Sequence, residues 1–309
     1  MSGPGNMPSG ATEEGEGAAQ HRKTWKALMI EAYGRFHVVL EDERITHPGL
    51  TEYAIVDRVN SARGTFAWWW GAAGEIRETI NSINAWSVRL HEWGAWNEVI
   101  RSYDAEEDRW DVLNHFVEPI AFFCMLQPSS FADRLALNSE TLLHQANQSL
   151  FPEEPDRLDQ DATAGRPLRR SDRRKQLVKL GQRWAYFGEF QQALHALDGA
   201  DYRHVTRNYR DLASHSFSPR LMLGHVQRAL RTYGPLQDLM KQPNGSYQHV
   251  DHPTKKSVSY AMVSLEPLAL EETFAANFAE FQRAHHAMKC FIALVGAMCE
   301  RMQQQVLKP

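Results

Sequence analysis

The chain has 309 residues, of which 43% are hydrophobic and 23% are charged, and its formal net charge is −4 at pH 7. This length allows one large domain or two domains of ordinary size, and the composition is typical of a globular protein. A mildly acidic chain is not a basic nucleic-acid binder over its whole surface, although a local basic patch is compatible with it.

Targeting signals and cysteine motifs are not found in the sequence. Residues 1–20 are rich in Gly, Pro, Ser and Glu without the apolar core of a signal peptide, so we expect a disordered tail. The most apolar later run, CFIALVGAM, is too short to cross a bilayer. Three cysteines without a CxxC pair indicate a reducing compartment, so we expect a cytoplasmic protein that does not contact membranes.

From residue 21 to about residue 150 the hydrophobic spacing is that of helices, with residues recurring three and four apart. We expect a first helix from residue 21 that ends at THPGL (46–50), followed by helices over residues 51–70 and 75–103. The inner stripe of the third helix consists of Ile76, Ile80, Ile83, Leu90 and Trp93. In the segment that follows, Pro119 predicts a kink or a restart, and Pro128 is expected to close the segment.

A charged connection divides the chain. Residues 151–172 hold three prolines, an acidic first half and a basic second half, which is typical of a linker. We therefore predict a disordered tail, an N-terminal helical region, a linker and a C-terminal helical bundle, with bounds 1–20, 21–150, 151–172 and 173–309.

The C-terminal bundle should begin with a helix over 172–198 and continue with one from Ala200 to just before Pro219. Alternation at Val258, Tyr260 and Met262 predicts a short strand, paired with 247–250 across the sequence DHPTKK. The last helix has an unbroken apolar seam that lines either an intrachain core or a dimer interface: Phe278, Phe281, His285, Met288, Ile292, Val295, Cys299 and Met302. The expected fold class is all-α, a helical bundle or bundles with at most a short β-hairpin near 246–264.

The helix expected before Pro219 contains the most chemically specific stretch, RNYRDLASHSFSPR. On a helical wheel, residues 202–215 have one apolar face and one face of arginines, histidines and their hydrogen-bonding partners, without Lys or Glu. Metal-free RNA cleavage needs a histidine as general acid or base and a guanidinium to stabilise phosphate charge. His215 and Arg210 fit these roles, and Asp211, four residues before His215, can orient its imidazole.

Arg210, Asp211 and His215, in the stretch RDLASH, match the arginine–polar–x–x–x–histidine signature and so resemble HEPN domains, the helical bundles of many prokaryotic RNases, toxins and defence proteins. The resemblance covers residues 172–305 at most. It implies a homodimer in which two motifs face each other and build a composite RNase site. A protein of the toxin type is also compatible with a neutralising protein partner.

Further basic residues accompany the motif. Arg207 and Asn208 precede it, and Arg220 and His225 follow it closely, so all four are candidates for binding RNA phosphates. A short helix that shows its arginines to water explains the second pair equally well. The basic run over 166–175 either grips phosphates or forms a helix start that is neutralised by the acidic residues before it.

Aromatic and metal-binding patterns point to structure more than to ligands. Three adjacent tryptophans, Trp68 to Trp70, face three directions on a helix and suit a core or a subunit contact, as do Trp86, Trp93 and Trp96. No metal-binding, phosphate-loop, dinucleotide or nucleophile-elbow motif is present, so we expect no metal and no cofactor.

Two functional hypotheses follow from the sequence. The first is a metal-independent endoribonuclease of the toxin or defence type, active on RNA as a homodimer through Arg210, Asp211 and His215. The second is a non-enzymatic interaction or scaffold protein that oligomerises through its aromatic-rich helices.

Overall fold

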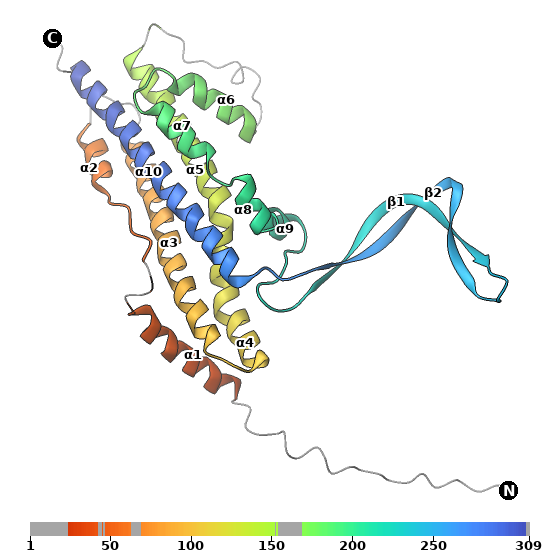
Figure 1. Cartoon of the computed structure of the whole chain (residues 1–309). Helices are drawn as coiled ribbons and strands as arrows, with labels where there is room; N and C mark the ends of the chain where they lie inside the picture. The colour runs from red at the N-terminus through yellow and green to blue at the C-terminus, as the bar shows by residue number, and fades with distance from the viewer. Residues whose placement is uncertain are drawn as a thin grey trace, which may run out of the picture.

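The computed structural model of the chain describes residues 24–42, 45, 47–62, 69–151, 153 and 169–306. Its elements are a series of helices and one long β-hairpin, in agreement with the expected fold class (Figure 1). In chain order they are α1 (Trp25–Leu40), α2 (Ala54–Ser61), α3 (Trp69–Arg101), α4 (Glu106–Val112), the π-helix η1 (Leu113–Val117), α5 (Glu118–Leu150), α6 (Arg170–Gly181), α7 (Phe187–His195), α8 (Ala200–Val205), α9 (Tyr209–His215), β1 (Val226–Lys241), β2 (Tyr247–Leu265) and α10 (Leu270–Val306).

Three long helices, α3, α5 and α10, form the centre of the bundle and pack against one another (Figure 1). The shorter helices cover this centre: α1 packs on α3, α2 on α3 and α10, and α6 on α5. Helix α7 packs mainly on α10, while α8 contacts α10 and α9 contacts α5. The motif helix α9 is therefore held against the side of the bundle rather than inside it.

The core follows the hydrophobic stripes that the sequence predicts. All five stripe residues of α3 are at most 1% exposed, and Trp86, Trp93 and Trp96 are buried with them. The predicted seam of α10 lies in the same intrachain core, with Phe281, Met288, Val295, Cys299 and Met302 at most 1% exposed. Both predicted helical regions contribute to this one core, and the tryptophan-rich helix α3 is at its centre.

Two prolines shape the helix that begins after η1. The π-helix η1 leads directly into α5 at Glu118, with Pro119 in the first turn, so the proline lies where the helix changes type and not at a break in it. Pro128 does not close the segment, because α5 continues through it to Leu150. Proline has no N–H for the carbonyl four residues earlier, here that of Cys124. The Asn277 Nδ2 of α10 donates to this carbonyl oxygen instead, at 3.0 Å, which lets the helix continue.

Two other expected helices are shorter than the sequence indicates. The helix expected over 51–70 is α2, which ends at Ser61, and Trp69 already belongs to α3. The helix expected over 172–198 is divided into α6 and α7, because Tyr186 adopts a left-handed conformation with φ of 65°. Hydrophobic periodicity does not reveal such breaks, since the same side of the chain stays apolar across them.

The helix expected from Ala200 to before Pro219 is also two helices, α8 and α9. Arg207 and Asn208 between them have positive φ values of 49° and 55°. Asparagine adopts this left-handed region more readily than most residues, and here it forms the N-cap position of α9. A single wheel over residues 202–215 is therefore wrong, since the two halves of the polar face belong to separate helices.

Strands β1 and β2 form an antiparallel ribbon, residues 226–265, that we call the arm (Figure 1). The pairing runs from Val226 opposite Leu265 to Lys241 opposite Tyr247, with an irregularity between Pro235 and Gln237. The arm projects away from the helical bundle (Figure 1). The segment after Arg220, for which a short helix was one interpretation, forms β1 instead.

The predicted strand pairing across DHPTKK is wrong in register and length. The reversal occurs at residues 242–246, where Gly245 has φ of 86° and Asn244 Oδ1 accepts from the Ser246 N–H at 3.0 Å. The DHPTKK sequence lies inside β2 near the register irregularity. There the Nδ1 of His252 accepts from the backbone N–H of Lys255 at 3.1 Å, so a local turn-like contact stands within the ribbon.

No residue of the arm is buried, although all of it lies within the described part of the chain. Its root is fixed by a bridge between Leu221 and Leu268, both of which are buried. Among the described helices, none is long and apolar enough to cross a membrane.

Candidate functional site

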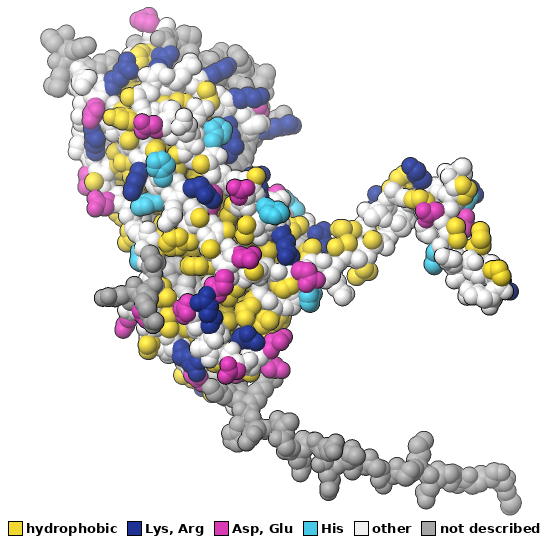
Figure 2. All heavy atoms as spheres, viewed as in Figure 1, with side chains coloured by type: hydrophobic (Ala, Val, Ile, Leu, Met, Phe, Trp, Pro, Cys, Tyr) yellow, Lys and Arg dark blue, Asp and Glu magenta, His cyan; other side chains and the backbone are white. Residues whose placement is uncertain are grey.

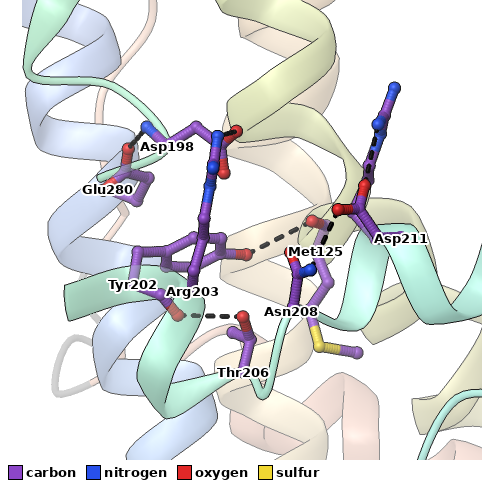
Figure 3. A network of polar contacts seen from close by, with 9 residues as sticks. Met125, Asp198, Tyr202, Arg203, Thr206, Asn208, Asp211 and Glu280 are labelled. Carbon is purple, nitrogen blue, oxygen red and sulfur yellow. Dashed lines mark hydrogen bonds and ion pairs between the residues drawn. The ribbon is translucent and has the colours of Figure 1, made fainter. Parts of the chain in front are cut away.

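The three predicted catalytic residues all lie on α9, and their side chains are wholly or partly exposed. Arg210 Nη1 donates to Asp211 Oδ1 at 2.9 Å, and Asn208 Nδ2 donates to Asp211 Oδ2 at 2.9 Å (Figure 3). The hydrogen bond from Arg210 lowers the pKa of Asp211 most, and the one from Asn208 lowers it further. Asp211 is therefore an anion that stabilises the N-terminal end of α9.

His215 is the last residue of α9, and its side chain is exposed. The carboxylate of Asp211 accepts hydrogen bonds from Arg210 and Asn208. It therefore does not orient the imidazole of His215, although the sequence led us to expect this. Arg210 and His215 are five positions apart, which places them about 140° apart around a helix. One copy of α9 therefore does not bring this arginine and this histidine to one point, and a composite site would need a second copy.

The predicted phosphate-binding residues lie at the root of the arm. Arg207 Nη1 donates to the backbone oxygen of Glu266, the residue after β2. His225 Nδ1 lies 3.2 Å from Glu266 Oε2, and Arg220 Nη1 lies 3.0 Å from Glu118 Oε2. Sequence reasoning did not identify Glu118 and Glu266, because nothing in the local pattern shows which acidic residue a distant arginine will reach.

These ion pairs contribute little to the free energy of folding, and a ligand can take the place of one partner. The side chains of Arg210 and Arg220 are 42% and 46% exposed, and that of His225 is 57% exposed. Exposed ion pairs contribute about 0–1 kcal/mol. A phosphate group can therefore compete for these side chains without unfolding the site.

Helix α8 is anchored beneath this surface by a buried polar network (Figure 3). Tyr202 is buried, its hydroxyl accepts from Asn277 Nδ2 at 2.8 Å, and it donates to the Met125 carbonyl at 3.3 Å. Burial raises the pKa of this phenol, so it is neutral at all ordinary pH values. Glu280, with a fully buried side chain, accepts from the Asp198 N–H and pairs with Arg283 at 2.6 Å. The network fixes the position from which the chain turns into α9.

A hollow of about 260 Å³ opens between α5, α9 and the loop that leads to the arm. Its lining includes two exposed aromatic side chains, Phe122 at 44% and Phe217 at 65%, and the largely buried Tyr209. The lining also includes Arg220 and Glu118, the ion pair at the root of the arm. One sequence signal points to this hollow, the phenylalanine between two serines just after the motif, Phe217.

Charge is unevenly distributed along the chain. Residues 203–265, which contain the end of α8, all of α9 and the arm, hold nine Lys and Arg but three Asp and Glu. The rest of the chain holds the other 25 Lys and Arg and 35 Asp and Glu. The formal charges are therefore +6 for this segment, which we call the basic segment, and −10 for the remainder.

Other predicted features have structural partners or fall outside the described residues. Within the basic run over 166–175, Arg173 pairs with Glu140 of α5. The Trp68 to Trp70 side chains lie outside those that the structure describes. In the part of the chain that is described, no three His, Cys, Asp or Glu side chains are grouped so as to hold a metal ion.

Comparisons with family models, with curated proteins and with solved structures find no match to this chain.

Proposed function

We propose that this protein binds RNA through its basic segment and cleaves it, as a homodimer, at α9. The observation that carries the binding part is the charge separation, +6 on one contiguous segment against −10 elsewhere. Neutralisation of phosphates by Lys and Arg supplies most of the sequence-independent affinity for nucleic acid. Arg210 and Arg220 have side chains that are 42% and 46% exposed, and Arg231 of β1 is exposed, so a phosphate backbone can reach the segment.

The cleavage part rests on side-chain chemistry and on the HEPN resemblance. His215 has an exposed imidazole, the side chain that most often serves as a general acid or base. Arg210 carries a guanidinium that can stabilise charge on a phosphate. Since these two groups do not converge within one α9, the second copy in the homodimer would supply the partner group. The 2′-hydroxyl that such a reaction uses restricts it to RNA.

Binding is tested by the salt dependence of RNA affinity, measured by fluorescence anisotropy. Replacement of Arg228 and Arg231 by Gln should weaken binding and reduce the slope of log K against log salt concentration by about 1.4, since each phosphate contact on a single strand contributes about 0.7. The matched control replaces Arg77 and Arg89 of α3 by Gln, which changes the net charge equally. Equal effects of the two double variants would contradict binding by the basic segment.

Cleavage is tested by incubating the chain with mixed RNA in EDTA, beside His215→Ala and Arg210→Ala. We expect the wild type to cleave and both variants to bind RNA without cleaving it. The control is Ser214→Ala, which alters an exposed neighbour on the same helix. If all the variants cleave RNA, or if none of the proteins cleaves the RNA that it binds, the proposed catalysis at α9 is wrong. The proposed RNA binding would then still stand.

A second function, non-enzymatic self-association, is favoured by the apolar side chains of the arm. A two-stranded ribbon alone is marginally stable in water. This one exposes eight large hydrophobic side chains, namely Leu230, Tyr233, Leu239, Met240, Tyr247, Val258, Tyr260 and Met262, and hydrophobic atoms are spread along the arm in Figure 2. Light scattering over a range of protein concentrations tests this function, and a chain that stays monomeric would exclude it. Trp86, Trp93 and Trp96 of α3 are buried in the core, so these three tryptophans do not form such a contact.

A further inference from the structure

We infer that the hollow between α5, α9 and the 216–220 loop is a binding pocket for one unstacked nucleobase of single-stranded RNA. The inference rests on the proposed RNA binding and names the part of the RNA that this surface takes. It adds a site for a base to the proposed contacts with the phosphates and the 2′-hydroxyl of the RNA.

The first argument is the aromatic lining. Phe122 from α5 and Phe217 from the loop are exposed beside a cavity, where neither contributes fully to the core. Tyr209 of α9 also lines the hollow, with its ring 6.2 Å from that of Phe122 at an angle of 71°. Bases of single strands bind by stacking on such aromatic faces, and every base has a face to offer.

The second argument is the rigidity of this lining. Tyr209 is 8% exposed and its hydroxyl is hydrogen-bonded to Ser218, while burial raises the pKa of the phenol. Pro219, which follows Ser218 in the loop, is buried. Tyr209 and Pro219 are therefore held in place before a ligand binds, so that little conformational freedom is lost on binding.

The third argument is size. A volume of about 260 Å³ is just below the roughly 300–1,000 Å³ of pockets that hold drug-sized ligands. One purine or pyrimidine ring system fits such a space, whereas a dinucleotide does not. The pocket also has a polar wall, where Arg220 offers donors and Glu118 offers acceptors to the edge of a base.

The fourth argument is position. The lining includes Ala213 and Ser216, which lie within two residues of the exposed His215 in the sequence. It also includes Val226, the first residue of the arm. A strand that follows the basic segment from α9 to the arm thus passes the mouth of the pocket. One base can turn inward there while its phosphates stay with the arginines.

The experiment measures affinity for a short single-stranded RNA of mixed sequence and for the same backbone with abasic sites, by anisotropy at fixed salt. The wild type should bind the abasic strand about tenfold more weakly, the typical effect of losing one stacked base. Phe217→Ala and Phe217→Leu should bind the intact RNA about tenfold more weakly and no longer distinguish the two strands. Phe217→Tyr, which keeps an aromatic face, should behave as the wild type does.

Phe122→Ala should lose affinity in the same way, and Leu137→Ala is its matched control, an equally exposed apolar residue of α5 away from the pocket. If the wild type binds RNA but Phe217→Ala and Phe122→Ala bind equally well, the pocket inference is overturned and RNA binding stands. If Phe217→Leu behaves as the wild type does, stacking is excluded. If the wild type binds neither strand, RNA binding itself fails, and the pocket inference falls with it.

Discussion

Asn277 compensates for a proline in another helix. Its Nδ2 donates to the Cys124 carbonyl, which Pro128 leaves without a helical donor, and its Oδ1 accepts from the Trp86 indole at 3.0 Å. All these groups are buried, and a buried polar group without a partner costs about 1–3 kcal/mol. One amide of α10 therefore joins α3 and α5 at the centre of the bundle.

Replacement of Asn277 by Ala should lower the free energy of unfolding by about 3 kcal/mol, because it leaves at least two buried groups unpaired. Tyr202→Phe, which removes one hydroxyl from the same network, should cost about 1 kcal/mol. Urea denaturation followed by circular dichroism measures both values. In a Pro128→Ala background the Cys124 carbonyl regains a backbone donor, so Asn277→Ala should cost less there. An equal cost in both backgrounds would show that Asn277 does not compensate for the proline.

Single-residue predictions from the sequence succeeded where burial decides the outcome. The stripe of α3 and the seam of α10 were identified because an apolar residue every three or four positions has one energetically favourable place, the core. The relation of Arg210, Asp211 and His215 was not predictable in the same way. It depends on the positive φ values of Arg207 and Asn208 and on which of several nearby groups each side chain pairs with.

At the scale of elements, the joint between α6 and α7 depends on a glycine. A Cβ at Gly181, the last residue of α6, would lie 2.0 Å from the ring of Phe187, which is buried. A Cβ at Gly188, in the first turn of α7, would have no neighbour within 4 Å. A methyl group is thus excluded at Gly181 but has room at Gly188, seven residues later.

Gly181→Ala should lower the melting temperature, since forcing a methyl group into a packed core costs about 1–3 kcal/mol. Gly188→Ala should raise it slightly, because alanine in a helix is favoured over glycine by up to about 1 kcal/mol. Thermal unfolding followed by circular dichroism compares the two variants directly. Equal and small shifts would mean that the α6–α7 joint can move aside for the methyl group.

The arm was the element that the sequence predicted least well. Its strands place apolar and polar side chains on both exposed faces, so the strict alternation of a half-buried strand is missing. Pro235 and Pro253 interrupt the pattern further and lie near the register irregularity. The reversal at Asn244 and Gly245 carries a turn signal, but a turn alone does not fix the length of the strands beside it.

For the whole molecule, the structure separates a core from an appendage. The hydrophobic core contains no residue of 226–265, and the two ends of the arm are joined at its root by the Leu221–Leu268 bridge. The bundle carries the excess negative charge and the arm, together with α9, carries positive charge. The hydrophobic core and the excess positive charge thus lie largely in different parts of one chain.

A variant in which residues 227–264 are replaced by a short Gly–Ser turn should therefore keep its helical circular dichroism and melt within a few degrees of the full chain, because a loss of 1 kcal/mol shifts the melting temperature of a large domain by only about 2–4 °C. The same variant should bind single-stranded RNA far more weakly, since five Lys and Arg of the basic segment lie in the replaced residues. A large fall in melting temperature that depends on protein concentration would instead mean that the arm stabilises a second copy. That outcome would favour self-association over RNA binding as the role of the arm.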